Sequence, residues 1–144
     1  MTDTRRLSPR LLAIVDQLPL RPGLKVLEIG GGTGAAACAV ARRVAPGGRV
    51  LMIDRSEKSL AIARRTGADV ISDGLLEVRM AAVEEFVPEP ADRPFELAFA
   101  IRVGVLDGRH PQAGTAALDR LRAAAAPGAR LAVCGDGPLR WLDL

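Results

Sequence analysis

Aromatic residues and cysteines are scarce in this chain of 144 residues, which has no tyrosine, one tryptophan, three phenylalanines and two cysteines. Nucleic-acid binding usually combines a basic stripe with aromatic rings that stack on bases. Here the net charge is +3 and the arginines are scattered through every segment, so the sequence argues against a nucleic-acid partner. Cys38 and Cys134 are far apart and lack a CxxC spacing, which argues against a disulfide and against a bound metal.

Long apolar runs are also missing. None approaches the roughly 20 residues that cross a bilayer, and the segment MTDTRRLSPR at the N-terminus lacks the apolar core of a secretory signal. We therefore expect a cytoplasmic protein without a membrane partner. The length suits one domain, and 49% hydrophobic with 26% charged residues is typical of a folded protein. We predict a single domain over residues 1–144, with residues 1–8 as a loose tail.

Short apolar segments alternate with longer helix-forming segments along the chain. The predicted strands are 24–29, 49–54, 75–80, 95–101 and 129–135. Helices are predicted from Ser8 to Leu18, which Ser8 would cap, and at 33–45, 56–73 and 112–126, with a helical turn near 83–86. This alternation is typical of βαβ units, so the expected fold class is α/β with a parallel sheet and right-handed crossovers.

Four of the five residues from Gly30 to Gly34 are glycines, in the segment EIGGGTGA, where a predicted strand meets a predicted helix. Glycine permits positive φ and close approach of another molecule, and the free N–H groups of the helix start favour a polar or anionic ligand. Asp54 ends the next strand 20 residues after Gly34, a spacing that suits an acid on ribose hydroxyls. Together these features indicate an adenosine-containing ligand; the alternative is a tight packing turn that binds nothing.

Two kinds of adenosine ligand fit this turn. Gly30, Gly32 and Ala35 satisfy the Gly-x-Gly-x-x-(Gly/Ala) pattern of nicotinamide dinucleotide sites. Glu28, just before the first glycine, would place a negative charge badly for a pyrophosphate but well for an ammonium group. A nucleoside with a positively charged amino-acid tail therefore fits better than NAD.

These motifs resemble the class I S-adenosylmethionine-dependent methyltransferase family. The segments that carry the resemblance are VLEIGGGTG (26–34), VLMID (50–54), FELAFAIRVGVL (95–106) and LRAAAAPGARLAV (121–133). The resemblance spans about residues 10 to 135. It implies a Rossmann-like three-layer sandwich with strand order 3-2-1-4-5, S-adenosylmethionine as cofactor, S-adenosylhomocysteine as product, and in-line transfer of a methyl group, which we expect to go to a small molecule.

The resemblance also implies roles for single residues. Glu28 would lie near the methionine end of the cofactor, Asp54 would hold the ribose hydroxyls, and Arg55 would lie beside the adenine. Ile101 and Arg102 would border the transferred methyl group. The full set of implied cofactor-binding residues is Glu28, Gly30, Gly31, Gly32, Gly34, Asp54, Arg55, Ala82, Val83 and Ile101.

The chain departs from the family pattern in two places. Ala82 stands where many members have an aspartate that accepts a hydrogen bond from the adenine amino group, which leaves the adenine to backbone groups or to Glu84. The final segment DGPLRWLDL is too short for both strands that normally follow the fifth, so we expect strands 6 and 7 to be missing or truncated. Either the tail or a second subunit must then cover the fifth strand's edge, and we favour a homodimer.

Two residues after the fourth strand are candidates for the catalytic step. The loop AIRVGVLDGRHP lacks the Asn/Asp-Pro-Pro-aromatic signature that the family uses for amino groups of bases or amides. His110, the only histidine, is a candidate general base, or else an ordinary loop residue. Arg102 is a candidate for holding an acceptor carboxylate or phosphate, or else an ion-pair partner of Asp107 or Glu96. A non-catalytic nucleotide-binding module or partner subunit is the main alternative function, and an NAD-binding protein the second.

Overall fold

The strands form one sheet in the order β3-β2-β1-β4-β5-β6. The computed structural model describes residues 7–106 and 109–144, so most of the predicted tail and Asp107 lie outside the described residues. The first five strands are mutually parallel, and β6 runs antiparallel to β5. The strands are β1 Lys25–Ile29, β2 Arg49–Asp54, β3 Leu76–Met80, β4 Phe95–Ile101, β5 Ala125–Cys134 and β6 Arg140–Asp143.

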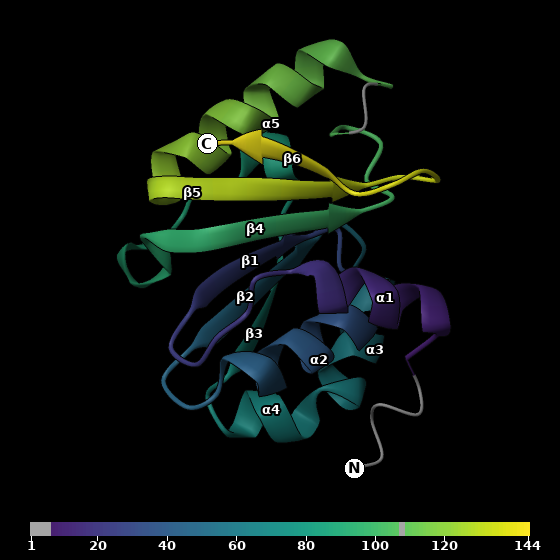
Figure 1. Cartoon of the computed structure of the whole chain (residues 1–144), viewed down its shortest axis with the longest axis vertical. Coiled ribbons are helices and arrows are strands. Elements are labelled where there is room, and N and C mark those ends of the chain that lie inside the picture. Colours follow the sequence, from purple (N-terminus) through teal and green to yellow (C-terminus); the bar gives the residue numbers. More distant parts are fainter. Residues whose placement is uncertain (1–6, 107–108) are drawn as a thin grey trace.

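Helices cover both faces of the sheet (Figure 1). One face packs against α1 Pro9–Gln17, α2 Ala35–Val44, α3 Glu57–Thr66 and α4 Ala68–Ser72, and the other against α5 Pro111–Ala124 and the 3-10 turn η2 Val83–Glu85. A second 3-10 turn, η3, spans Pro90–Asp92. Within the described part of the chain, no helix combines the length and apolar character needed to cross a membrane.

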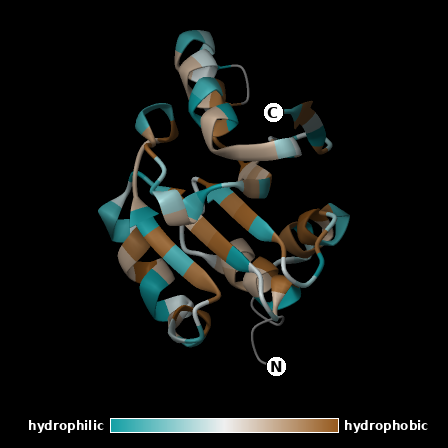
Figure 2. Cartoon of the chain, turned by 90° about the vertical axis from the view of Figure 1, so that its left-hand side faces the viewer, coloured by the Kyte–Doolittle hydropathy of each residue, from teal (hydrophilic) through white to brown (hydrophobic). Residues whose placement is uncertain are grey.

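Two apolar clusters make the sheet the middle of three layers. Neighbouring residues of one strand point to opposite faces, so Val26 joins the cluster under α1 to α4 while Leu27 joins the cluster under α5. Hydrophobic residues accordingly run along the central strands, interrupted by hydrophilic ones (Figure 2). The predicted α/β Rossmann-like sandwich and the strand order 3-2-1-4-5 are therefore confirmed.

Two predicted elements differ from the structure by more than two residues. The helix predicted at 56–73 is split at Gly67 into α3 and α4. A Cβ at Gly67 would lie 3.0 Å from Leu76 Cδ2 and 3.1 Å from Cys38 Sγ, so the chain turns here where its backbone packs closely against β3 and α2. The predicted fifth strand began at residue 129, whereas β5 begins at Ala125, directly after the end of α5 at Ala124.

The C-terminal segment forms β6 and covers part of the edge of β5. Leu131 pairs with Leu142 and Ala132 with Trp141, and the guanidinium carbon of Arg130 lies 4.3 Å from the centroid of the Trp141 ring. One of the two expected final strands is thus present. The tail therefore covers part of this edge, which is one of the two ways of covering it that the sequence left open, and the homodimer stays a prediction.

We expect Trp141→Ala to destabilise the protein by about 1–2 kcal/mol, because the half-buried ring packs on the core and on Arg130. Thermal unfolding followed by circular dichroism measures this change. Val87→Ala, at a side chain that is 69% exposed, is the matched control and should change stability by no more than about 0.5 kcal/mol. Equal melting temperatures for the two variants would contradict the role given to β6.

Candidate functional site

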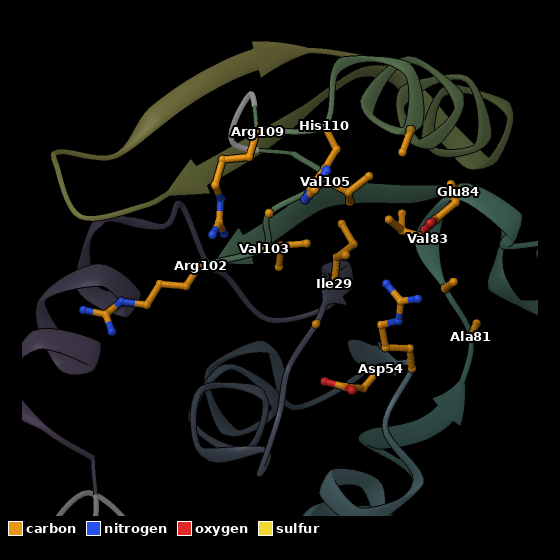
Figure 3. A pocket seen from close by; sticks show the side chains of 15 residues that line it. Ile29, Asp54, Ala81, Val83, Glu84, Arg102, Val103, Val105, Arg109 and His110 are labelled. Carbon is orange, nitrogen blue, oxygen red and sulfur yellow. The ribbon is translucent and has the colours of Figure 1, made fainter.

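A cavity of about 560 Å³ opens at the carboxyl ends of the parallel strands. The strand order reverses between β1 and β4, and such a switch point is where open α/β sheets bind ligands. The cavity wall comes from four strand ends: Ile29 and Gly30 at the end of β1, Asp54 and Arg55 at the end of β2, residues 81–84 after β3, and residues 102–105 after β4. Arg109, His110 and Ala113 complete it beside α5 (Figure 3).

The glycine turn combines close packing with bare backbone. Gly30, Gly32 and Gly34 have φ values of 67°, 59° and 86°, which residues with a side chain rarely adopt. A Cβ at Gly30 would lie 2.7 Å from Val103 Cγ2, and one at Gly31 would overlap the Met52 side chain. A Cβ at Gly32, by contrast, would project into open space. The turn therefore packs tightly against Val103 and Met52, while its backbone at Gly32 stays accessible.

The Asp54 carboxylate joins this turn to the next one. Oδ2 accepts a hydrogen bond from the Gly32 N–H at 2.8 Å, and Oδ1 accepts one from the Ser56 N–H, also at 2.8 Å. Ser56 in turn caps α3, because its side chain accepts from the Ser59 N–H. Asp54 is 9% exposed and lines the cavity. Each carboxylate oxygen keeps a further lone pair that a ligand hydroxyl can reach.

Glu28 lies beneath the glycine turn with an unsatisfied oxygen. Its side chain is 2% exposed, and among the described residues its Oε1 has no hydrogen-bond partner. Burial, and secondarily the charge of Asp54, raises the pKa of Glu28 from 4.5 to about 8. The negative charge expected here is therefore absent in most molecules at neutral pH, since the carboxyl group carries a proton. A cation brought close would favour its ionisation.

The ten implied cofactor-binding residues fall into two groups. Gly30, Asp54, Arg55, Ala82 and Val83 line the cavity. Glu28, Gly31, Gly32, Gly34 and Ile101 do not form its wall: they lie in or beneath the turn, or, for Ile101, against the apolar core. A Cβ at Gly34 would lie 3.0 Å from Ala63 Cβ, so that glycine serves helix packing. Contact of each residue with a cofactor stays a prediction.

The two candidate catalytic residues both line the cavity but differ in direction. His110 is the N-cap residue of α5 and lies beside Val105 near the cavity wall (Figure 3). Arg102 extends away from Asp54 (Figure 3), and its Nη2 lies 3.6 Å from Asp136 Oδ1. Of the two alternative ion-pair partners of Arg102, Glu96 pairs with Arg21 instead, at 3.2 Å, and Asp107 lies outside the described residues.

Sequence reasoning missed Arg109, which lies next to the predicted His110 and also lines the cavity. A Cβ on Gly104 would come within 2.9 Å of Arg109 Nη2, so the guanidinium rests directly on a bare glycine. The signal available in the sequence was a glycine and an arginine in the same loop, five positions apart.

The residues fit the adenosine cofactor that the turn indicated. The buried Glu28 oxygen lacks a partner that a ligand cation could provide, Gly32 leaves its outer side open, and Asp54 presents a carboxylate at the cavity. Ala81, Ala82 and Val83 add an apolar wall after β3 that suits a base ring. These features together define a nucleotide-binding domain of the Rossmann-like class.

Comparison with known proteins identifies the family. Residues 26–128 match the profile described as "Methyltransferase domain", and the chain therefore belongs to this methyltransferase family. It is 38% identical over 116 residues to the ubiquinone/menaquinone biosynthesis C-methyltransferase UbiE of Bordetella avium, covering 79% of this chain and 41% of that protein. It is 33% identical to the protein-L-isoaspartate O-methyltransferase of Methanothrix thermoacetophila, covering 58% of this chain and 48% of that protein.

Solved structures show the same fold. Phosphoethanolamine N-methyltransferase 2 of Haemonchus contortus, in complex with phosphomonomethylethanolamine and S-adenosylhomocysteine, aligns with a TM-score of 0.69 and 25% identity. The alignment covers 86% of this chain and 27% of that one. This chain spans less than half the length of these relatives.

We expect Glu28→Gln to stabilise the protein more at high pH than at low pH. Between pH 4.5 and about 8 the folded protein holds a Glu28 proton that the unfolded chain has lost, so stability falls as pH rises through that range. Glutamine removes this dependence. Its advantage in melting temperature should grow by at least about 2 °C between about pH 5.5 and 8.5.

Differential scanning calorimetry across this range measures the effect. Glu85→Gln changes an exposed glutamate that follows Glu84 in η2 and serves as the control, with a curve parallel to that of the unchanged protein. Parallel curves for Glu28→Gln as well would show that Glu28 is ionised in the folded state.

Proposed function

We propose that this chain is a single S-adenosylmethionine-dependent methyltransferase domain that acts on a small molecule. The observation that carries the proposal is the cavity at the β1 switch point, where the glycine turn and Asp54 lie together in a chain of the methyltransferase family. The relatives named C-methyltransferase and O-methyltransferase support it.

Each wall of the cavity would serve one part of the cofactor. Asp54 would accept hydrogen bonds from the ribose hydroxyls, since its oxygens are already oriented by the N–H groups of Gly32 and Ser56. Ala82, Val83 and Arg55 would border the adenine, with Glu84 also on the wall and able to accept from its amino group. The Glu28 carboxyl group would lose its proton when the ammonium group of the methionine end binds nearby.

When bound, S-adenosylmethionine supplies a methyl group already activated by its sulfonium, so the chain's residues mainly have to position the acceptor. Arg102 and Val103 follow β4 and line the cavity, and they would exclude water from the acceptor together with Ile101 at the end of that strand. His110 would take a proton where the acceptor must lose one. Its position on the wall is the support for this role.

A non-catalytic nucleotide-binding module is the second candidate. Ala82 favours it, because the cavity wall carries a methyl group where many family members have a carboxylate. The two candidates differ in turnover, since both would bind the cofactor but one would transfer no methyl group. An NAD-binding role has less support, because the matching family and the named relatives are methyltransferases.

We also propose a cytoplasmic homodimer that forms along β6. Both cysteines are buried and neither forms a disulfide, which suits a reducing compartment. The segment Arg140–Asp143 is self-complementary for antiparallel pairing, because Arg140 of one copy would face Asp143 of the other and Trp141 would face Leu142.

Titration calorimetry tests the cofactor proposal. We expect S-adenosylmethionine and S-adenosylhomocysteine to bind with micromolar Kd and NAD to bind much more weakly. Asp54→Ala should weaken binding at least about tenfold, since hydrogen bonds to a charged group contribute about 1.5–3 kcal/mol. Asp73→Ala, at an exposed aspartate after α4, is the matched control. Tight NAD binding would contradict the proposal.

Light scattering tests the dimer. We expect twice the chain mass of 15.2 kDa, and a shift toward the monomer for Asp143→Arg, which would place like charges opposite one another at both ends of the pairing. A monomer of the unchanged protein at high micromolar concentration would refute pairing through β6.

A further inference from the structure

A second cavity, of about 690 Å³, adjoins the first one. Arg102 and Arg109 line both cavities, so these two side chains stand at their junction. The rest of the second wall is the turn from Gly135 to Pro138, which leads from β5 to β6, together with Arg140 at the start of β6. Arg10 of α1 donates a hydrogen bond to the Gly135 carbonyl and so fixes one end of this turn.

Positive charge dominates this second wall. Among the described residues that line it, three are arginines and one, Asp136, is acidic. Asp136 is 95% exposed and lies 3.6 Å from the Arg102 guanidinium, which is 62% exposed. An ion pair so open to solvent contributes little stability. A ligand anion in a better position could therefore replace Asp136 as the partner of Arg102.

The backbone at Arg102 is strained in a way that favours a role for its side chain. Its φ is 59°, and no other residue with a side chain has a positive φ in the described part of the chain. A glycine would adopt this conformation without cost, and such strain concentrates at ligand sites. The Arg102 N–H donates to the Cys134 carbonyl at 2.7 Å, which ties this residue to the end of β5.

Arg109 is positioned by its own loop. Its guanidinium lies against Gly104, where an added Cβ would come within 2.9 Å of Nη2 and 3.2 Å of Cζ. Figure 3 shows Arg109 pointing toward the end of β4, beside Val103 and Arg102. Arginine presents a planar fork of donors that matches a carboxylate or phosphate.

We propose that the second cavity binds a carboxylate or phosphate group of the methyl acceptor, with Arg102 and Arg140 as its principal ligands. This inference rests on the proposed function. The acceptor then extends from its anionic group in the second cavity past Arg102 toward the first cavity, where the methyl group is transferred. Arg102 and Arg140 thereby restrict the enzyme to anionic acceptors.

The cofactor's own carboxylate is the other possible source of an anion. The described residues of the second wall all follow β4 in sequence, and the glycine turn and Asp54 contribute nothing to it. The cofactor residues discussed above lie mainly on the β1, β2 and β3 side. The second cavity therefore belongs to the acceptor.

The test uses phenyl phosphate and phenol as probes on the protein saturated with S-adenosylhomocysteine. Titration calorimetry should show phenyl phosphate binding at least about tenfold more tightly than phenol, and Arg102→Gln and Arg140→Gln should each weaken phenyl phosphate about tenfold, as expected when a charge-assisted hydrogen bond is lost. Arg64→Gln is the matched control, because Arg64 pairs with Glu57 on the surface of α3; it should leave binding unchanged. Thermal melts check that each variant is folded.

Three results separate failure of this inference from failure of the proposed function. If S-adenosylhomocysteine itself does not bind, the proposed function fails. If it binds but phenyl phosphate binds no better than phenol, the inference alone is overturned. If phenyl phosphate competes with S-adenosylhomocysteine, and Arg140→Gln weakens the latter, the second cavity holds the cofactor carboxylate and the acceptor assignment is wrong.

Discussion

The Asp54 carboxylate is the contact on which the candidate site depends. By accepting from the N–H groups of Gly32 and Ser56, it fastens the turn after β1 to the turn after β2. Buried polar backbone groups need such partners, and the left-handed glycines could otherwise vary in position. Asp54 also lines the cavity, so one side chain both shapes the site and would present an acceptor to a ligand.

The burial of Glu28 costs free energy in the ligand-free protein. Its burial without a partner for Oε1 among the described residues is unfavourable in the ligand-free protein, and the raised pKa reports that cost as a retained proton. An incoming cation would relieve it. In the proposed function the Glu28 carboxyl group would become charged as the cofactor binds, so the affinity should depend on pH.

The sequence allowed the fold to be predicted where local signals and burial agree. Apolar segments bounded by glycine and proline marked the first four strands well, and the Ser8 and Ser56 caps placed two helix starts. The break at Gly67 was missed because it depends on contact with Leu76 and Cys38, which are distant in sequence. β6 was missed because a strand of four residues forms only through its pairing with β5. For the same reason the second cavity, which joins Arg102 to Arg140, could not be anticipated, whereas Glu28 and Asp54 were marked by their positions at strand ends.

A crystal structure with S-adenosylhomocysteine tests the central claim most directly. The account predicts the nucleoside in the cavity beside Gly30, with both ribose hydroxyls on the Asp54 carboxylate and the amino group on the side of Glu28. An empty cavity, or a nucleoside bound with Asp54 untouched, would contradict it.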